Sequence, residues 1–320
     1  MYSEPLLSVR NLTVDYVTDR DVLRAVDNLS FDIGRGEVFG LAGESGCGKS
    51  TAAFAVARLT RLPGLVSGGK VMLDGTDVLA LTGEALRAFR WASVSFVFQS
   101  AMNALNPVIP ICEQLTDVIH AHSKVSPAEA RARAAEMFDL VGISPKRLDD
   151  YAHQFSGGMR QRICIAIALC LRPKLIIMDE PTTALDVVVQ RDIIEQICAL
   201  KDQFGFSVLF ITHDLGLMVE FCDRIGVMYA GKLVEVAPAA TILKAARHPY
   251  SAALGRSFPP LSGPRERLTG IAGTPPDLRH RAEGCRFAPR CAKALPQCLT
   301  QEPQLTSLDA QEGVAACHLL

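Results

Sequence analysis

Short apolar runs and alternating segments along residues 1–245 predict a sheet whose strands are separated by helices. Leu7 to Tyr16 and Leu29 to Ile33 alternate apolar and polar side chains, as strands with one covered face do. The run 38–42 is apolar throughout, which is typical of parallel strands that are covered on both faces. Further short apolar runs occupy 94–98, 175–178 and 208–212. The pattern therefore favours the α/β class.

Helical patterns occupy much of the chain between these runs. A glycine-rich turn after residue 42 leads into a helix that we expect over about 49–59. Between 99 and 172 the pattern is largely helical, and Ser126-Pro127, with Glu129 in the first turn, has the residues of a capped helix start. We expect a helical subdomain at about 99–172, inserted into an α/β core that spans 1–245.

The pattern changes at about residue 246. Clusters of proline and glycine at Pro259-Pro260, Gly263-Pro264 and 273–276 interrupt the sequence that follows. Such clusters mark turns, so we expect a loop-rich C-terminal extension over 246–320. Four of the ten cysteines lie in this extension.

The charge balance narrows the class of partner. The 320 residues carry 33 Lys and Arg against 34 Asp and Glu, for a formal net charge of -1. This balance gives no general attraction to nucleic acid or to anionic lipid. The longest apolar run, 163–171, is far shorter than the roughly 20 residues that span a bilayer. Residues 1–10 also lack the pattern of a signal peptide. We expect a soluble cytoplasmic protein that binds no nucleic acid.

A glycine-rich segment between a predicted strand and a predicted helix matches the phosphate-loop pattern. It reads Gly43-Glu44-Ser45-Gly46-Cys47-Gly48-Lys49-Ser50-Thr51. Its glycines let backbone N–H groups turn towards phosphates, and the helix N-terminus adds a favourable dipole. Lys49 is expected to reach the β- and γ-phosphates of ATP, and Ser50 to supply its hydroxyl to Mg²⁺. A purely structural glycine turn is the alternative interpretation, which the flanking strand and helix disfavour.

Two carboxylates follow the apolar run 175–178. We expect Asp179 at the edge of the sheet beside the phosphate loop, where it would hold Mg²⁺ or its waters. Glu180 would direct the attacking water as a general base. On its own, a strand that ends in two acids at the surface would explain this pattern equally well. The phosphate loop upstream favours the catalytic interpretation.

Phe155-Ser156-Gly157-Gly158 leads into a helix expected over 161–171 and forms a second candidate anion site at a helix N-terminus. One nucleotide does not need two such sites in one chain, but two chains placed head to tail would each lend this motif to the other's γ-phosphate. Here the sequence resembles the nucleotide-binding subunits of ABC transporters, in motif order over about the first 245 residues. The family usually has leucine in place of Phe155, where we expect local repacking rather than loss of function.

Four further residues match the family in order. The resemblance implies that Tyr16 stacks on adenine and that Gln99, at a strand end, lies near the γ-phosphate and Mg²⁺. It implies that Asp186 belongs to the D-loop at 184–186 and that His213 is the switch histidine. Taken alone, Tyr16 reads as a packing aromatic, Asp186 as a helix N-cap, and His213 as part of a capping or surface pair. The ordered set favours catalytic roles for Glu180, His213 and Gln99.

The extension is similar to one branch of this family. The segment 98–107, the tripeptide His248-Pro249-Tyr250 and the segment 273–278 resemble those of oligopeptide, dipeptide and nickel importer ATPases. The four cysteines of the extension are Cys285, Cys291, Cys298 and Cys317. Disulfides are disfavoured in a reducing cytosol, so a metal or cluster site becomes the leading interpretation of these thiols.

Four thiols in a segment with little core could fold around Zn²⁺ or an iron–sulfur cluster, and free thiols are a third interpretation. Their spacing is wider than the two to four residues usual within the Cys pairs of structural zinc sites. The resemblance implies a [4Fe–4S] cluster held by Cys285, Cys291, Cys298 and Cys317. Such a cluster would act as a staple for a core-poor segment. We expect His318 to lie outside the ligand set.

These features together predict an ATPase that powers solute uptake at the cytoplasmic face of the membrane. The resemblance implies a second, similar but distinct ATPase subunit, two transmembrane permease subunits and an extracytoplasmic substrate-binding protein as partners. Oligopeptides or dipeptides are the first expected solute, and nickel or another small solute the second. The rivals are a soluble ATPase acting on nucleic acid or ribosomes, an exporter, and a redox sensor regulated by ATP. The neutral charge and single phosphate loop argue against the first rival, and the extension argues against the exporter.

Overall fold

The computed structural model describes residues 4–19, 21–99, 104–183, 185–257, 270–279, 282–308 and 313–320. The expectations for Ala184, for 100–103, and for the turns at Pro259-Pro260 and Gly263-Pro264 lie outside the described residues. The chain divides into two compact units. Unit one comprises Met1–Leu6, Gly34–Glu37 and Ala80–Leu209, and unit two comprises Leu7–Ile33, Val38–Leu79 and Phe210–Leu320.

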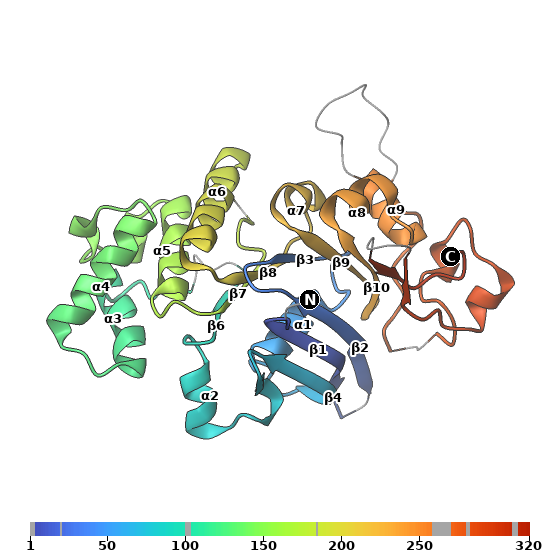
Figure 1. The fold of residues 1–320 in the computed structure, drawn as a ribbon, viewed down its shortest axis with the longest axis horizontal. Helices are drawn as coiled ribbons and strands as arrows, with labels where there is room; N and C mark the ends of the chain where they lie inside the picture. The colour runs from blue at the N-terminus through green and yellow to red at the C-terminus, as the bar shows by residue number, and fades with distance from the viewer. Residues whose placement is uncertain are drawn as a thin grey trace. The chain divides into compact units, whose positions relative to one another are not determined.

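Unit one is mainly helical (Figure 1). Its helices are α2 (Gly83–Phe89), α3 (Ile111–His122), α4 (Pro127–Leu140), α5 (Gly157–Leu169) and α6 (Val187–Phe204). Its strands β6 (Val94–Val97) and β7 (Leu175–Asp179) pair in parallel, and β8 (Ser207–Ile211) begins in this unit and ends in unit two. Helices α3, α4 and α5 pack on one another and bury Leu115, Phe138 and Ile163. This packing occupies the stretch where we predicted a helical subdomain.

Local sequence explains where two of these helices begin. Ser126 is the N-cap of α4, and its Oγ accepts a hydrogen bond from N of Glu129 at 3.2 Å, as its sequence pattern predicts. The expected bounds of α5 were wrong at both ends. It begins at Gly157 rather than 161 because Ser156 caps it, and it ends at Leu169 rather than 171 because Arg172 adopts a left-handed φ of 51°.

Unit two contains an antiparallel sheet in the order β2-β1-β4-β5. Its strands are β1 (Leu7–Val17), β2 (Val22–Ile33), β4 (Gly64–Leu73) and β5 (Thr76–Asp77). Leu7 lies opposite both Ile33 and Leu73, so β1 is the strand that joins its two neighbours. The strands predicted from alternation at 7–16 and 29–33 are present, although β2 starts earlier than expected, at Val22.

A second group of strands in unit two runs in the order β11-β12-β10-β9-β3. They are β11 (Thr306–Ser307), β12 (Val314–Ala315), β10 (Lys232–Pro238), β9 (Arg224–Tyr229) and β3 (Val38–Ala42). Strands β3 and β9 are parallel, and every residue of β3 is buried, as its apolar run predicts.

Helix α1 (Lys49–Val56) follows β3 and is shorter than the expected 49–59. Arg58 has a left-handed φ of 58°, and the N–H of Leu59 donates to O of Phe54 at 2.7 Å. This is the Schellman arrangement, which ends a helix by satisfying its last carbonyls. Its αL position is usually glycine, so Arg58 gave no sequence signal for the end of the helix.

The extension contains more regular structure than we expected. Two helices precede it, α7 (Leu215–Phe221) and α8 (Ala239–Ala245). The extension itself forms α9 (Pro249–Arg256), which lies against α8 (Figure 1). His248 is the N-cap of α9, and its Nδ1 accepts a hydrogen bond from N of Tyr250 at 3.0 Å. Strand β12 pairs with β10, with Ala315 opposite Glu235. The extension therefore adds a helix and two short strands to unit two.

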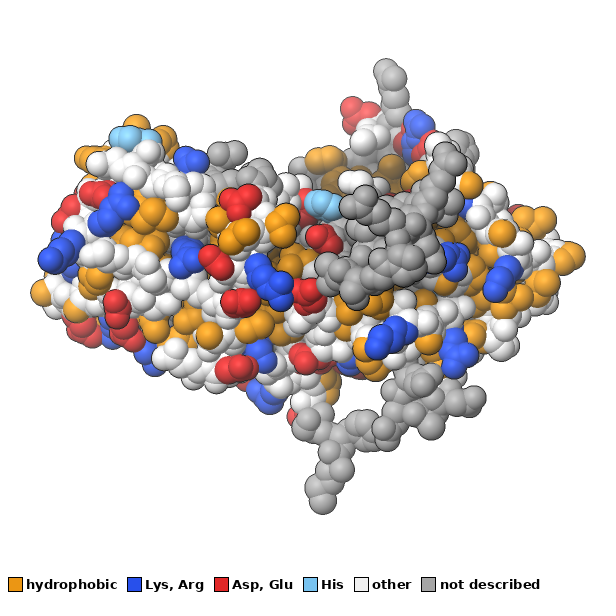
Figure 2. Space-filling model, turned by 90° about the horizontal axis from the view of Figure 1, so that it is seen from above, with side chains coloured by type: hydrophobic (Ala, Val, Ile, Leu, Met, Phe, Trp, Pro, Cys, Tyr) orange, Lys and Arg blue, Asp and Glu red, His pale blue; other side chains and the backbone are white. Residues whose placement is uncertain are grey.

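Within the described residues, no helix combines the length and apolarity needed to cross a bilayer. Figure 2 shows basic and acidic side chains intermixed on the face that it presents. This mixture agrees with the nearly equal numbers of basic and acidic residues in the sequence.

Candidate nucleotide site and cysteine site

The phosphate-loop segment joins β3 to α1 in unit two, as predicted. Gly43 and Gly48 have positive φ angles of 146° and 104°. A Cβ atom at Gly43 would lie 2.2 Å from O of Met228, and one at Gly48 would lie 2.3 Å from O of Ala25. No side chain fits so close to a backbone oxygen, so both positions require glycine.

Lys49 lies inside this loop. This lysine is only 6% exposed, and its Nζ donates to the carbonyl oxygens of Gly43 at 2.8 Å and Glu44 at 3.0 Å. The first turn of α1, which is fully described, carries no acidic side chain. The helix N-terminus and the lysine ammonium therefore both favour an anion at this loop.

The other predicted residues of the loop differ in exposure. The tip at 45–46 is exposed, whereas Cys47 is buried, and burial raises the pKa of its thiol. Ser50 and Thr51 are half-buried in the first turn of α1. Oη of Tyr16, at the end of β1, lies 3.4 Å from Oγ1 of Thr51. The fold thus brings the predicted adenine-stacking residue next to the helix that follows the loop.

His213 follows β8 in unit two and is exposed. Its neighbour Asp214 caps α7, because Oδ1 of Asp214 accepts a hydrogen bond from N of Leu217 at 3.1 Å. N of Asp214 also donates to Oγ1 of Thr212 at 3.2 Å. Capping therefore explains Asp214, and the exposed His213 lies between β8 and this cap.

The two predicted carboxylates follow one another at the end of β7 in unit one. Asp179 is 2% exposed, whereas Glu180 is half-buried and has a φ of 47°, which is uncommon for a residue other than glycine. Oε2 of Glu180 accepts hydrogen bonds from Nε2 of Gln99 at 2.9 Å and from Oγ1 of Thr183 at 3.0 Å. These two donors fix the direction of the carboxylate.

Neither of these hydrogen bonds to Glu180 was predicted from the sequence, and Thr183 was not among the predicted site residues. A signal was present in Pro181, which follows Glu180 and favours a turn at that point. The turn is closed by N of Thr183, which donates to O of Glu180 at 3.3 Å. A residue three positions after the carboxylate is thereby turned back towards it.

The glycine pair of the second anion motif lies at the N-terminus of α5 in unit one. Ser156 is exposed, and its Oγ accepts a hydrogen bond from N of Met159 at 3.4 Å. A Cβ atom at Gly158 would lie 2.7 Å from Cγ1 of Val189, so α5 and α6 approach closely there. Asp186 is the N-cap of α6, as its simpler interpretation suggested, with its Oδ1 accepting from N of Val189 at 3.0 Å.

Phe155, which departs from the family's usual leucine, packs inside unit one. The residue is 4% exposed, and its ring meets that of Phe138 edge-on with centroids 6.3 Å apart. The guanidinium carbon of Arg147 lies 4.1 Å from the centroid of the Phe155 ring. The ring of Phe155 therefore packs between α4 and the cation of Arg147, and the expected local repacking relative to leucine stays a prediction.

All four cysteines of the extension line one small cavity of about 10 Å³ in unit two. Cys298 is buried, and Cys285, Cys291 and Cys317 are half-buried. N of Cys285 donates to O of Cys298 at 2.8 Å. Burial raises the pKa of the Cys285 thiol, and the neighbouring Cys298 adds to this shift. In the part of the chain that the structure describes, no group of three or more His, Cys, Asp or Glu has the geometry to hold a metal ion.

Two residues of the extension contact the phosphate loop, and neither contact was predicted from the sequence. Oη of Tyr250 accepts a hydrogen bond from N of Glu44 at 2.9 Å. Arg290 forms a bidentate ion pair with the Glu44 carboxylate, with N–O distances of 2.7 and 2.9 Å. Glu44 and Arg290 lie 246 residues apart, so no local pattern could have linked them.

Comparison with known proteins gives matches over nearly the whole chain. A family model described as ABC transporter matches 26–183, and one described as the C-terminal region of oligopeptide/dipeptide transporters matches 234–298. The oligopeptide transport ATP-binding protein OppD of Haemophilus influenzae is 43% identical over 307 residues, covering 95% of this chain and 94% of that protein. OppD of Mycobacterium tuberculosis is 45% identical over 317 residues, covering 98% of this chain and 52% of that protein.

A solved structure supports the same assignment. A dimeric ATP-binding cassette in a post-hydrolysis state, bound to ADP and Pi, is similar with a TM-score of 0.65 and 28% identity. The match covers 73% of this chain and 98% of that one. The expected α/β cassette fold is therefore confirmed. On the combined evidence of the loop geometry and these matches, the chain belongs to the ABC transporter family, among its ATP-binding subunits.

Proposed function

We propose that this chain hydrolyses ATP to power the uptake of oligopeptides or dipeptides through separate membrane permease subunits. The observation that carries the proposal is the extent of the similarity to the two OppD proteins, which includes both the phosphate loop and the extension. The extension alone is matched by a family model described for oligopeptide/dipeptide transporters. We propose that 1–245 is the ATPase domain, with its helical subdomain at about 99–172, and that 246–320 is an addition to it.

Within this proposal, the phosphate loop binds the phosphates of ATP. Lys49 leaves the carbonyl oxygens of Gly43 and Glu44, which it contacts in this structure, and binds the β- and γ-phosphates. Ser50, Gln99 and Asp179 would hold Mg²⁺. This ion neutralises phosphate charge when it is bound with ATP.

Glu180 orients and deprotonates the attacking water as a general base. Its carboxylate is already aimed by the hydrogen bonds from Gln99 and Thr183, which reduces the cost of orienting it during the reaction. His213 steadies the γ-phosphate, and Tyr16 stacks on adenine.

A second ATPase subunit, similar to this chain but distinct, completes the site. Ser156, Gly157 and Gly158 at the start of α5 contact the γ-phosphate held by that subunit, and Asp186 lies in the loop that faces it. The exposure of Ser156 supports this role, since a residue that meets a partner's nucleotide must lie at the surface. Two permease subunits and an extracytoplasmic binding protein complete the importer, and this chain lies at the cytoplasmic face of the membrane.

We propose that Cys285, Cys291, Cys298 and Cys317 hold a [4Fe–4S] cluster that staples the extension. The support for this proposal is that four thiols, the usual ligands of such a cluster, come from a segment with little core and line the same cavity. Within the described residues these thiols are not arranged as a metal site, so binding the cluster would require them to move closer together. His318 also lines this cavity, and its Nε2 lies 2.9 Å from O of Gln301, so the ring already has a polar neighbour.

The cluster is tested by measuring iron, acid-labile sulfide and zinc in protein purified without oxygen. The wild type should contain iron and sulfide in equal amounts, and Cys298→Ser should lose both. Cys198→Ser, which removes a cysteine of α6, serves as the matched control and should retain them. Zinc without sulfide would contradict the cluster and would favour a zinc site at the same thiols.

The proposed function is tested with Glu180→Gln in the full-length chain. This variant should bind ATP with the affinity of the wild type, and its hydrolysis rate should fall by a factor of about 100 or more. Glu195→Gln is the matched control, because Glu195 lies on α6 in an exposed ion pair with Arg191. Hydrolysis by Glu180→Gln at the rate of the wild type would remove Glu180 from the role of general base.

Glu180→Gln also identifies the partners. With ATP and Mg²⁺ present, this variant should retain its complex during purification from native membranes, and mass spectrometry should identify two permeases, a second ATPase and a binding protein. Recovery of ribosomes or of a soluble partner alone would contradict transport and leave the ATPase assignment in place.

A further inference from the structure

Glu44 is the residue of the phosphate loop that Tyr250 and Arg290 of the extension bind, through a hydrogen bond and an ion pair. Its backbone N–H donates to Oη of Tyr250 at 2.9 Å, and its carbonyl oxygen accepts from Nζ of Lys49 at 3.0 Å. Its carboxylate forms the bidentate pair with Arg290. Each polar group of Glu44 therefore has a partner. Residues of the extension bind its side chain and its N–H, and Lys49 binds its carbonyl oxygen.

The Arg290 side chain is itself firmly placed. It is 5% exposed, and it donates to the carbonyl oxygen of Ala272 at 2.8 Å and to Oη of Tyr229 at 3.2 Å. Its guanidinium carbon lies 5.7 Å from the ring centroid of Tyr229 and 6.0 Å from that of Phe287. A guanidinium held on several sides presents its two N–H groups to a carboxylate in one geometry.

The aromatic rings behind this ion pair belong to one packed cluster. Tyr229 and Tyr250 have centroids 4.6 Å apart, and Phe287 lies 5.2 Å from the first and 5.3 Å from the second. Tyr250 and Tyr229 are 0% and 1% exposed. The acceptor for the Glu44 N–H and the arginine that binds its carboxylate thus share a rigid support.

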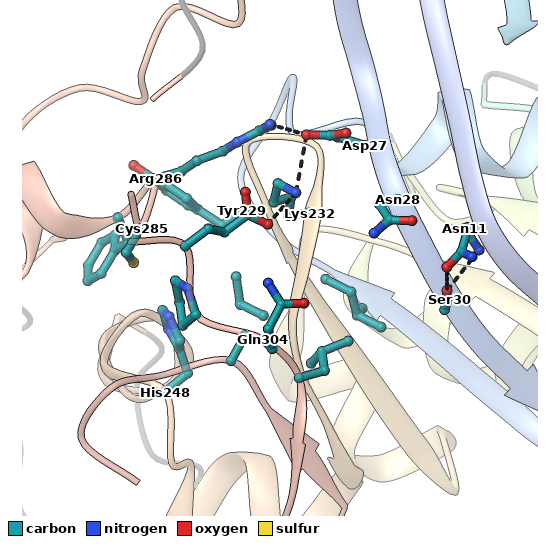
Figure 3. A pocket seen from close by; sticks show the side chains of 17 residues that line it. Asn11, Asp27, Asn28, Ser30, Tyr229, Lys232, His248, Cys285, Arg286 and Gln304 are labelled. Carbon is teal, nitrogen blue, oxygen red and sulfur yellow. Dashed lines mark hydrogen bonds and ion pairs between the residues drawn. The ribbon is translucent and has the colours of Figure 1, made fainter. Parts of the chain in front are cut away.

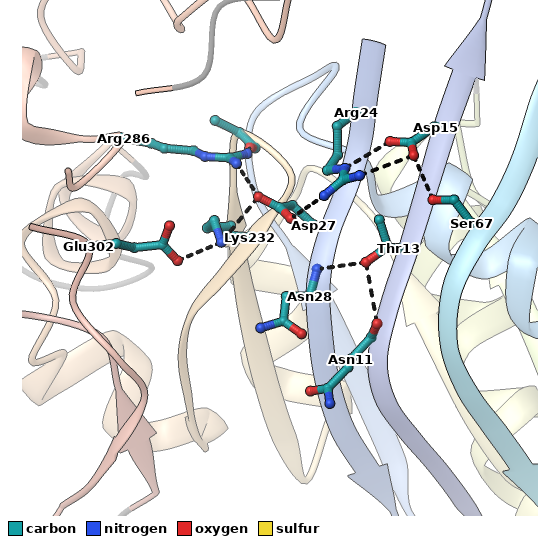
Figure 4. A network of polar contacts seen from close by, with 11 residues as sticks. Asn11, Thr13, Asp15, Arg24, Asp27, Asn28, Ser67, Lys232, Arg286 and Glu302 are labelled. Atoms are coloured by element: carbon teal, nitrogen blue, oxygen red, sulfur yellow. Dashed lines mark hydrogen bonds and ion pairs between the residues drawn. The ribbon is translucent and has the colours of Figure 1, made fainter. Parts of the chain in front are cut away.

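A second arginine of the same segment supports the far end of the loop. Arg286 donates to the carbonyl oxygen of Ala230 and forms an ion pair with Asp27, which also binds Lys232 at 3.2 Å (Figure 4). N of Gly231, the residue after Ala230, donates to O of the loop residue Cys47 at 2.9 Å. Arg286 therefore supports the turn to which the loop is bonded.

Figure 3 shows that Arg286 reaches Asp27 at the margin of a cavity of about 260 Å³. Cys285, Tyr229, Lys232 and Asp27 also line this cavity. At this cavity, Asp27 of β2 pairs with Arg286 and with Lys232, and Lys232 pairs in turn with Glu302 of the extension. Arg286 is the residue of the segment 285–291 that forms an ion pair at this cavity.

We propose that Arg290 is a positioning residue of the phosphate loop and that, with Arg286, it makes the segment 285–291 a determinant of ATP affinity. The segment begins at Cys285 and ends at Cys291, so the proposed cluster would fix both ends of the segment that carries Arg286 and Arg290. The inference rests on the proposed function, because it assigns these residues to the binding of ATP by that loop.

The physical reason is preorganisation. A loop already held in its binding conformation loses less conformational freedom when the nucleotide arrives. Without the ion pair, the start of the loop is free to sample other conformations, and ATP must order it. Arg290 touches no reacting atom in this scheme, so its loss should weaken binding far more than it slows the chemical step.

The test is a double-mutant cycle on ATP affinity in the full-length protein, measured with a fluorescent ATP analogue and Mg²⁺. Arg290→Ala and Glu44→Gln should each raise the Kd by about tenfold. Arg290→Lys keeps the charge but not the paired N–H geometry, and it should give a smaller rise of about threefold. The double variant Glu44→Gln/Arg290→Ala should be no worse than either single variant, because both remove the same contact.

A change in KM for ATP with kcat within about twofold is the second expected result, since a positioning residue acts on binding. Arg279→Ala is the matched control, because Arg279 belongs to the same extension but forms an exposed pair with Asp277. An Arg290→Ala protein with the affinity of the wild type would overturn the proposal, and so would full additivity of the two substitutions. Failure of the wild type itself to bind the analogue would instead refute the proposed function.

Discussion

Glu235 offers a sharp test of how the start of the extension is attached to β10. This residue of β10 is 0% exposed, and its two carboxylate oxygens accept hydrogen bonds from N of Arg247 at 2.7 Å and from N of His248 at 3.0 Å. These bonds hold the turn that places the start of α9. Glu235→Ala would leave both N–H groups without this acceptor, at a cost of roughly 1–3 kcal/mol each.

Removing the carboxylate also relieves the cost of burying its charge, which offsets part of this loss. We therefore expect Glu235→Ala to lower the free energy of unfolding by about 3 kcal/mol. Glu235→Gln keeps one acceptor oxygen and turns the other into a donor that faces an N–H group. Glu235→Gln should therefore lower the free energy of unfolding by less, about 2 kcal/mol.

Urea unfolding gives these values, and hydrogen exchange at 247 and 248 locates the effect. Asp277→Ala, which removes an exposed ion pair of the same extension, is the control and should cost at most about 1 kcal/mol. The reasoning would be refuted if Glu235→Ala lowered the free energy of unfolding by less than the control does. Unchanged amide exchange at 247 and 248 would refute it as well.

Three further predictions concern individual side chains. Burial lowers the pKa of His248 to about 4, so the unfolded chain binds a proton first as the pH falls. The wild type should therefore lose up to about 3 kcal/mol more stability than His248→Asn between pH 6.5 and 4, and equal slopes in urea titrations would contradict this. Phe155→Leu should cost about 1 kcal/mol in the same assay, because the contact with Arg147 is lost, while the ATPase rate stays within about twofold. Ser126→Ala should cost about 1 kcal/mol by removing the acceptor for N of Glu129, and an unchanged urea midpoint would exclude the cap.

The features that the sequence predicted well are those encoded by neighbouring residues. The phosphate loop is one of them, because Gly43 and Gly48 must approach backbone oxygens and Lys49 must follow at a fixed spacing. The buried strands are another, since a short apolar run between turns leaves few alternatives. The four-cysteine group was also recognisable, although only the fold shows that its members line one cavity.

The features that were missed depend on backbone conformation or on distant partners. The end of α1 depends on a left-handed arginine, Arg58, which no propensity rule favours. Helix α9 did carry a local signal, since His248 and Pro249 suit the first positions of a helix, but the surrounding loop signals obscured it. The ion pair between Glu44 and Arg290 arises only when the extension folds onto the loop.

The separation between Glu44 and Arg290 has a consequence for the newly made protein. The ribosome adds roughly 5–20 residues per second, so Arg290 is added roughly 12–50 s after Glu44, from which it is 246 residues distant. During that interval the phosphate loop of the growing chain lacks its contact with Arg290. Tyr250 is added only shortly before Arg290. A chain still in synthesis therefore carries an unbraced phosphate loop until Arg290 has been added, and under the role proposed for this arginine the chain would reach its full affinity for ATP only after that point.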